Sequence, residues 1–292
     1  MRQNWVCMRI PRVYSSPEMN GLGWAMGVCA LCKIESELKN SHLIPAAAYQ
    51  HVRGKKESGG GSPIRIDGGT RSAFQSDKQI TQFLLCSNCE NLLSKNGENI
   101  ISKLWWTHGG FPLLDKMKLE SVVGGVDEFL VHTHSNLDAR DREGLFYFAV
   151  SIFWRAHVWN WSGQTDPYKK ALGDKYEKEI RYFLLGAGLL SDARLFVHIN
   201  TNSEFCSMIR LPGVFREGGS THHSFSILGI DFWLYLGGSI SDELKNLSND
   251  KMLFASSDFA KTNSLNILAK FMRTKITRRG KLAKNGRGGS IA

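Results

Sequence analysis

The sequence lacks the features that mark membrane proteins, secreted proteins and disordered chains. Its longest apolar run, residues 145–154, is about half the roughly 20 residues needed to span a bilayer. Arg2 near the N-terminus is not followed by an apolar core, so we expect no secretory signal. Hydrophobic residues make up 42% and charged residues 22% of the 292 residues, which excludes disorder throughout. The sequence therefore predicts a globular, cytoplasmic protein without membrane contact.

Cysteine is scarce, but its spacing is informative. Six cysteines are too few for a disulfide scaffold in a chain of this length. Four of them form two C-x-x-C pairs, Cys29 with Cys32 and Cys86 with Cys89. Two such pairs complete a tetrahedral four-sulfur shell suited to Zn²⁺, and a closed shell leaves no position for a substrate. The sequence thus predicts a structural zinc site.

Acidic residues are missing from the end of the chain. None follows Asp258, whereas the net charge of the whole chain is +10. A basic tail of this kind indicates a polyanionic partner, because each neutralised phosphate releases counterions. The alternative is a solvated, frayed tail that aids solubility. The candidate nucleic-acid-binding cations are Lys270, Arg273, Lys275, Arg278, Arg279, Lys281, Lys284 and Arg287.

The residues between the cysteine pairs form an ordered pattern. Ser41-His42-Leu43-Ile44-Pro45 follows the first pair, a short apolar strand leads into the second pair, and a helix-like run begins at Glu90. This order resembles the zinc-ribbon branch of the HNH nucleases, the ββα-metal or His-Me finger superfamily, over residues 26–104. The resemblance implies phosphodiester hydrolysis, a nucleic acid partner with DNA favoured, and a catalytic Mg²⁺ or Mn²⁺ in addition to the zinc.

The resemblance also implies roles for single residues. His42 matches the general base that deprotonates the attacking water, and the four cysteines match the zinc ligands. Three positions depart from the family pattern. Ser41 stands where the family has a metal-ligating Asp, Thr81 where it has the Asn that orients the His, and Glu90 where it has the final His or Asn.

A carboxylate at the last of these positions is a suitable ligand for Mg²⁺ or Mn²⁺. Glu90 is therefore the candidate ligand of the catalytic ion, with Glu98 two helical turns further on as its partner unless Asn96 and Gly97 break the helix first. A water bound to Ser41, which is also a candidate catalytic residue, is the alternative to Glu98 as second ligand, and Asp77 is a weaker third carboxylate. The alternative is a finger that binds but does not cut, in which His42 is structural.

The rest of the chain is expected to form a larger domain of helices and antiparallel sheet, so the predicted fold class is α+β with an N-terminal zinc-stapled ββα-metal finger. A helix over residues 138–161 is apolar almost all round, which is typical of the centre of a domain. His222 and His223 lie beside a predicted hairpin turn, where we expect them to be exposed.

The other predicted elements are a helix over residues 168–190, strands over 194–200, 205–215 and 224–236, and a helix over 258–273. The predicted parts are an arm (1–25), the finger (26–104), an accessory domain (105–258) and a helix with the basic tail (259–292).

The sequence favours an HNH-type endonuclease whose C-terminal domain positions, regulates or recruits the finger, through a protein partner or an oligomer. Because HNH fingers are often joined to accessory domains in anti-phage systems, the resemblance implies a role as effector of a bacterial defence system. One alternative is a catalytically inactive zinc-finger protein that binds nucleic acid or scaffolds a complex. Another is a sensor in which residues 138–258 bind a ligand or a subunit.

Overall fold

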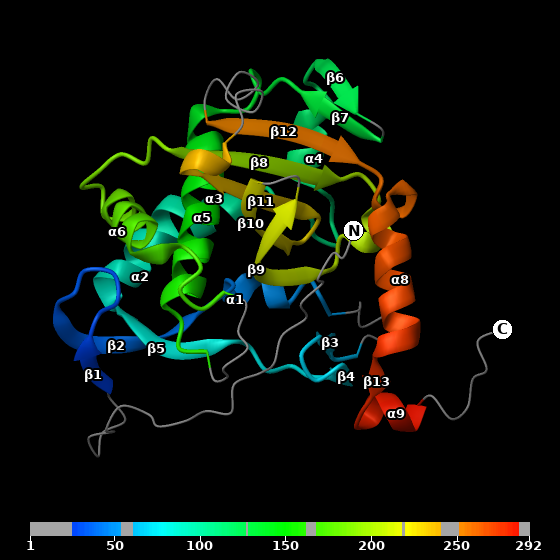
Figure 1. The fold of residues 1–292 in the computed structure, drawn as a ribbon, viewed down its shortest axis with the longest axis horizontal. Helices are drawn as coiled ribbons and strands as arrows, with labels where there is room; N and C mark the ends of the chain where they lie inside the picture. The colour runs from blue at the N-terminus through cyan, green and yellow to red at the C-terminus, as the bar shows by residue number, and fades with distance from the viewer. Residues whose placement is uncertain are drawn as a thin grey trace.

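The computed structural model describes residues 25–53, 61–126, 128–161, 168–217, 220–240 and 251–285. Over these residues the chain is a mixed α+β protein, as predicted, with three β-sheets and several helices (Figure 1). Apart from Ala25, the predicted N-terminal arm lies outside the described residues. None of the described helices has both the length and the apolar character needed to cross a membrane.

The cysteine-bearing segment begins with a small antiparallel sheet in the order β1-β2-β5. β2 and β5 pair from Leu38 opposite Cys86 to His42 opposite Thr81, with a bulge on β5 at Leu84. β5 leads directly into helix α2, which continues as the π-helix η2 and the short helix α3. The elements are β1 Ala25–Val28, β2 Glu35–His42, α1 Ala46–Tyr49, β5 Thr81–Cys86, α2 Ser87–Leu93, η2 Ser94–Glu98 and α3 Asn99–Ile101.

A second small sheet joins the middle of the chain to its end. β3 (Ile64–Asp67) and β4 (Ser72–Gln75) form an antiparallel pair, and β13 (Thr277–Arg278) pairs in parallel with β4. β13 lies between helix α8 (Asn263–Lys275) and helix α9 (Lys281–Asn285), and Figure 1 shows these three elements beside β3 and β4. The terminal helix was therefore correctly predicted, although its bounds differ. The tail is therefore structured, not frayed, over residues 263–285, and its partner stays a prediction.

The largest sheet has seven strands in the order β6-β7-β12-β8-β11-β10-β9. Neighbouring strands are antiparallel except β12 and β8, which run parallel. The single strand predicted over residues 224–236 is in fact parts of two, because Leu228 and Gly229 have φ angles of 46° and 84° and form a tight turn. β6, β7 and β12 are not among the predicted elements. The bounds are β6 Val122–Val126, β7 Phe129–His132, β8 Ala193–Asn200, β9 Ile209–Glu217, β10 Ser220–Ile227, β11 Ile230–Leu236 and β12 Met252–Ser257.

Helix α5 (Ala139–Val158) packs behind this sheet, as Figure 1 shows. Every residue from Gly144 to Ala156 is buried, which confirms the prediction of a central helix. Such burial on all sides follows from a sequence with no polar face along most of its length. The remaining helical elements are α4 Pro112–Met117, α6 Gly173–Leu184, η3 Ser203–Phe205, η4 Gly237–Ser239 and η5 Phe259–Lys261.

One continuous apolar core connects the cysteine segment to the seven-stranded sheet. It contains Leu31 from the first cysteine turn, Leu85 from β5, Phe148 from α5, and Phe225 and Phe232 from the seven-stranded sheet. The two phenylalanines of the sheet stack with their ring centroids 4.9 Å apart, and both contact Phe148 edge-on. Burial of such a side chain contributes about 1.5–3 kcal/mol to the free energy of folding. The shared core therefore stabilises the packing of α5 against the seven-stranded sheet and the cysteine segment.

Candidate functional site

The two C-x-x-C pairs converge, as predicted. The four Sγ atoms of Cys29, Cys32, Cys86 and Cys89 all lie within 4.8 Å of one another, and those of Cys32 and Cys86 are 3.9 Å apart. This cluster can hold a metal ion such as zinc. Within the described part of the chain it is the only group of three or more His, Cys, Asp or Glu side chains close enough to bind one ion.

Local hydrogen bonds shape both cysteine turns. In the first, the amide of Lys33 donates to the carbonyl of Cys29 at 2.9 Å, and Lys33 has a positive φ of 63° that reverses the chain. In the second, Cys86 is the N-cap of α2 and Cys89 lies in its first turn. The amide of Cys86 donates to Cys29 Sγ at 3.3 Å and so joins the two turns.

The thiols differ in how readily they ionise. Burial opposes ionisation of Cys29, but N–H groups of Cys32, Cys86 and Leu31 outweigh it and lower the pKa of its thiol. Burial raises the pKa of Cys32 and Cys89. Four thiolates in this space would repel one another without a cation, and a divalent ion supplies the compensating charge. The donor set therefore fits Zn²⁺.

His42 lies at the end of β2, where the first sheet meets the chain that comes from the second sheet. Its imidazole Nε2 is 2.6 Å from Oε1 of Gln79, and the side chain is partly exposed. Thr81, the position at which the family has the orienting Asn, is the strand partner of His42, but Gln79 makes the contact with the ring. The carbonyl of His42 accepts a hydrogen bond from Nη1 of Arg155 on α5 at 3.1 Å. Gln79 and Arg155 are residues that the sequence pattern did not identify.

The other predicted catalytic residues have different surroundings. The hydroxyl of Ser41 is buried at the β2–β5 bulge, where it accepts from the amide of Leu85 at 3.2 Å. Glu98 forms an ion pair with Arg155, at 2.6 Å between Oε1 and Nη2. Oε1 of Glu90 is buried and has no hydrogen-bond partner among the described residues. Of the three carboxylates predicted as ion ligands, Glu90 is therefore the one with a buried oxygen that lacks a hydrogen-bond partner among the described residues.

Asp77 is engaged in a local network. Its carboxylate pairs with Arg53 at 2.5 Å and accepts from the hydroxyl of Ser62 at 2.6 Å. Both contacts cross the insertion between β2 and β5. We infer that Asp77 holds this insertion in place, and nothing in its contacts points to an ion.

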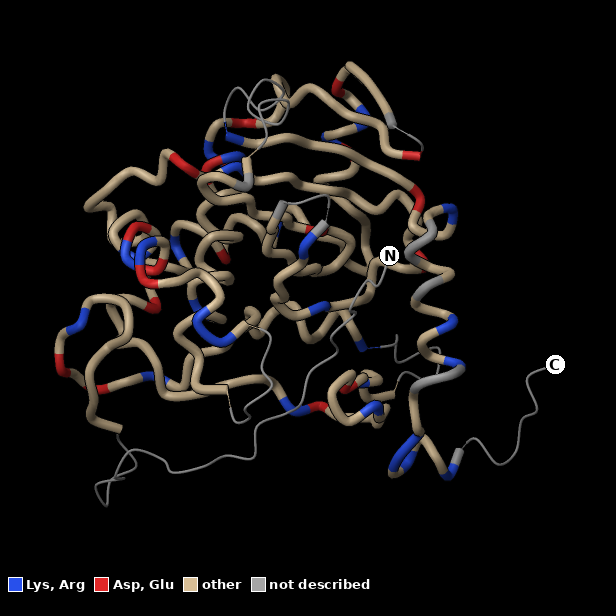
Figure 2. The backbone as a smooth tube through the Cα atoms, viewed as in Figure 1, with Lys and Arg blue, Asp and Glu red and all other residues tan. Residues whose placement is uncertain are grey.

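The predicted phosphate-binding cations lie on and around the second sheet. The amide of Thr277 donates to the carbonyl of Arg71 at 2.8 Å, and that of Arg279 to the carbonyl of Ala73 at 2.8 Å. Figure 2 shows basic residues along α8 and at β13 and α9, with no acidic residue among them. Arg287 lies outside the described residues, as does the side chain of Lys275. The exposed members of the predicted set are Lys270, Arg273, Arg278, Arg279, Lys281 and Lys284. Arg71, in the turn before β4, is a further exposed cation that was not predicted.

The prediction that His222 and His223 are exposed is wrong. Both lie within β10 and are buried, with exposed fractions of 8% and 5%. His222 stacks between Phe215 and Trp233, while His223 accepts from or donates to the hydroxyl of Tyr168 at 3.1 Å. Burial lowers the pKa of each imidazole to about 4. These residues contribute to packing on the two faces of the sheet.

A buried polar network joins three strands of the same sheet. His198 contacts Ser257 Oγ through Nε2 at 2.8 Å and Asp231 through Nδ1 at 3.1 Å. Burial opposes ionisation of Asp231, but His198 and Arg210 lower its pKa to about 2. His198 and Ser257 are each only 4% exposed. The network therefore has the contacts of a structural element that fixes strand register.

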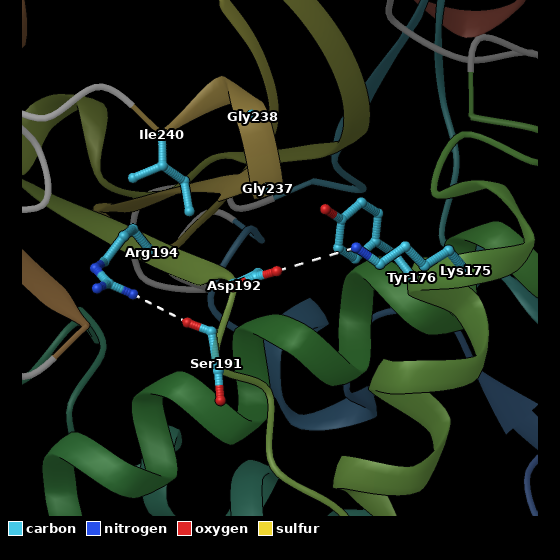
Figure 3. Close-up of a pocket in the computed structure, with 8 residues that line it drawn as sticks. All are labelled: Lys175, Tyr176, Ser191, Asp192, Arg194, Gly237, Gly238 and Ile240. Carbon is cyan, nitrogen blue, oxygen red and sulfur yellow. Dashed lines mark hydrogen bonds and ion pairs between the residues drawn. The ribbon is translucent and has the colours of Figure 1, made fainter.

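Figure 3 shows a cavity of about 290 Å³ between α6, the start of β8 and the turn at η4. Lys175 and Asp192 form an ion pair across it at 4.0 Å. Gly237 lies under the hydroxyl of Tyr176, since a Cβ there would be 1.9 Å from that oxygen. The lining residues are Lys175, Tyr176, Ser191, Asp192, Arg194, Gly237, Gly238 and Ile240, and none of them is a predicted site residue.

The structure thus brings together the four cysteines, and it places His42 beside Gln79 and Arg155. Comparison of the chain with protein-family models, with curated proteins and with solved structures gave no match.

Proposed function

We propose that this protein is a metal-dependent endonuclease of the HNH type, with His42 as its general base. β2, β5 and α2 supply two antiparallel strands and a helix in the order of a ββα-metal finger, stapled by the four-cysteine centre. The observation that carries the proposal is the position of His42. Its partly exposed imidazole is held by Gln79, which lies between the cysteine-bearing sheet and the second sheet (β3, β4 and β13, called the basic sheet for the exposed cations around it).

The contact with Gln79 selects the reactive nitrogen of His42. An amide oxygen only accepts hydrogen bonds, so Nε2 of the neutral ring donates to Gln79 Oε1 and Nδ1 keeps its lone pair. Nδ1 then takes the proton from a water molecule as that water's oxygen bonds to phosphorus and the bond to the leaving sugar oxygen breaks. An imidazole suits this role because it titrates near neutral pH.

Glu90 is the residue that would hold a catalytic ion. Its buried Oε1 has no hydrogen-bond partner in the described part of the chain, and a hard divalent cation is a suitable partner for such an oxygen. When bound, Mg²⁺ or Mn²⁺ would stabilise negative charge on the phosphate. Glu98 already has a cationic partner in Arg155, and the hydroxyl of Ser41 is taken up by the β-bulge.

The basic sheet would bind the nucleic acid backbone. Gln79, which contacts His42, lies only four residues after β4. The sheet that contains β4 and β13, with its exposed cations, therefore adjoins the proposed site. Arginine and lysine side chains bind phosphate without reading sequence. This arrangement would bring a scissile phosphate to His42 without requiring a particular base.

The alternative function is a zinc-finger protein that binds nucleic acid but does not cut it. The observation that favours it is the engagement of Ser41 and Glu98 in structural contacts, which leaves Glu90 as the one proposed ion ligand with an unpartnered oxygen among the described residues. Such a protein would need the cysteines and the basic sheet but not His42.

Cleavage of supercoiled plasmid and of single-stranded DNA and RNA separates the two functions. The nuclease requires Mg²⁺ or Mn²⁺, loses activity in EDTA at a concentration that leaves the zinc bound, and is inactivated by Glu90→Gln. The binding protein gives a salt-dependent shift in the same samples with intact substrate, and Glu90→Gln does not change the shift.

A further inference from the structure

Arg155 of helix α5 is buried beside His42, although the two residues are 113 positions apart. Its side chain is 1% exposed. Nη1 donates to the carbonyl of His42 at 3.1 Å, and Nη2 lies 2.6 Å from Glu98 Oε1. Nε and Nη2 are both buried without a hydrogen-bond partner among the described residues, so the contact of Nη2 with Glu98 is an ion pair only. One guanidinium from the larger, C-terminal part of the chain thus links β2 to the helix that follows the cysteines.

Two glycines allow the helices to approach closely enough for this contact. A Cβ at Gly97 would lie 3.0 Å from Cα of Phe148, and a Cβ at Gly144 would lie 2.5 Å from the side chain of Ile100. Gly97 contacts Phe148, whereas Ile100, three residues later, contacts Gly144, which comes four residues earlier in α5. The two helical segments therefore run antiparallel. Phe148 and Arg155 are seven residues apart and therefore lie on the same face of α5.

The π-helix changes which residues of the preceding helix share a face. In a regular α-helix, residues eight apart differ by about 80° around the axis, because each residue turns the chain by about 100°. η2 contains an extra residue, shown by the bond from the amide of Asn99 to the carbonyl of Ser94, which brings Glu98 to within roughly 20° of Glu90. The extra residue of η2 thus puts Glu90 and Glu98 on one face of this helix, and Glu98 on that face contacts Arg155.

Both Glu90 and Arg155 keep polar atoms without a hydrogen-bond partner. Glu90 Oε1 is an acceptor, whereas Arg155 Nε and Nη2 are donors, and all three are buried without a hydrogen-bond partner in the described part of the chain. Buried groups of this kind are rarely left unsatisfied in a folded protein. A purely structural ion pair between Arg155 and Glu98 would require neither Glu90 Oε1 nor Arg155 Nε.

We propose that Arg155 is a positioning residue of the nuclease site, so that α5 completes the site that the cysteine-bearing segment begins. It holds the main chain of His42 and the carboxylate of Glu98, and it thereby fixes His42 relative to Glu90. The inference rests on the proposed function for its kinetic consequence, but the fixing of His42 is measurable without catalysis.

The test compares Arg155→Lys and Arg155→Met with wild type and with Arg142→Met. Arg142 is a matched control on the same helix, since it donates to the carbonyls of Leu137 and His134 away from the site. Lys keeps the charge but lacks the fork that bridges two acceptors. For folded variants with unchanged zinc content, we expect kcat to fall about 100-fold for Met and at least tenfold for Lys, with KM for DNA within about threefold of wild type. Arg142→Met should cut like wild type.

The second readout is the ¹⁵N NMR signal of the His42 imidazole, assigned by its loss in His42→Ala. We expect this signal to shift in Arg155→Lys and not in Arg142→Met. Wild-type kcat together with an unshifted signal in Arg155→Lys would overturn the inference and leave the nuclease intact. If wild type does not cut with any divalent ion, the proposed function fails, and the NMR comparison alone then decides whether Arg155 positions His42. Should Arg155→Met fail to fold because Glu98 loses its partner, Arg155→Lys carries both readouts.

Discussion

The amide of Thr277 donates a hydrogen bond to the carbonyl of Arg71 at 2.8 Å, which joins the end of the chain to the insertion within the cysteine-bearing segment. Arg279 follows the strand directly, and its amide donates to the carbonyl of Ala73. Because β13 is only two residues long, these bonds hold it in register with β4. They turn a run of basic residues into one edge of a sheet.

Thr277→Pro removes the first of these donors and should release β13 from β4. The loss of one backbone hydrogen bond costs about 1 kcal/mol, which is enough to open a two-residue strand while the core stays folded. We expect faster amide hydrogen exchange at Arg279 and weaker binding of duplex DNA, at an unchanged melting temperature of the main transition. Thr277→Ala keeps the amide and serves as control. Unchanged exchange at Arg279 in the proline variant would show that β13 does not depend on this bond.

The exposed cations of the second sheet should determine the salt dependence of nucleic acid binding. Replacing Arg278, Arg279, Lys281 or Lys284 by Gln should reduce the slope of log affinity against log salt by roughly 0.9 each for duplex DNA. Lys178→Gln on α6 removes an exposed lysine on the other side of the molecule (Figure 1) and should leave the slope unchanged. Fluorescence anisotropy with a short duplex at several salt concentrations measures both. Equal slopes for all variants would place the nucleic acid elsewhere.

The cysteine cluster should bind one zinc ion per chain, and the metal should support the fold. Cys89→Ser removes one of four ligands next to the apolar core, so we expect loss of zinc and a decrease of roughly 4 kcal/mol or more in the free energy of unfolding. Cys206→Ala is the control, because Cys206 is a buried free thiol outside the cluster. Elemental analysis and urea unfolding provide the two measurements. Full zinc occupancy in Cys89→Ser would contradict the four-sulfur assignment.

Acid should destabilise the protein through its buried histidines. The pKa of His222 is about 4 in the folded chain and about 6.5 when unfolded, so the unfolded chain binds more protons between these values. Stability is therefore full above about pH 6.5 and is lost as the pH falls, by about 3 kcal/mol per such histidine at pH 4. His222→Phe preserves stacking between Phe215 and Trp233 and should flatten this dependence in urea unfolding at pH 7 to 4. An equally steep loss in the variant would show that other groups cause it.

The extent to which the sequence predicted the structure depended on the range of the interactions. The cysteine cluster and the buried helix α5 follow from spacing and from the absence of a polar face, both of which are local patterns. The parallel pairing of β12 with β8, and the insertion of β12 between β7 and β8, depend on contacts between segments far apart in the chain. The local sequence pattern does not determine which distant strands pair.

The errors within the site have similar causes. His222 and His223 follow a predicted glycine turn, a pattern typical of exposed residues, but the sheet continues to β9 on one side and β11 on the other and buries both. The contact with the His42 ring comes from Gln79, at the end of the insertion, and not from Thr81, where the family pattern has its orienting Asn. Arg155 comes from a helix that the pattern predicted only as core, and its contacts with His42 and Glu98 join segments far apart in the chain.

Plasmid nicking by wild type, His42→Ala and His134→Ala in Mg²⁺ or Mn²⁺ tests the central claim most directly. His134 is the matched control, since it lies after β7 and contacts Phe254, away from the cysteine segment. We predict cutting by wild type and His134→Ala, a loss of at least about 100-fold in His42→Ala, and equal zinc content in all three. Equal cutting by His42→Ala, or no cutting by wild type with either ion, would contradict the assignment of His42 as the base of a nuclease.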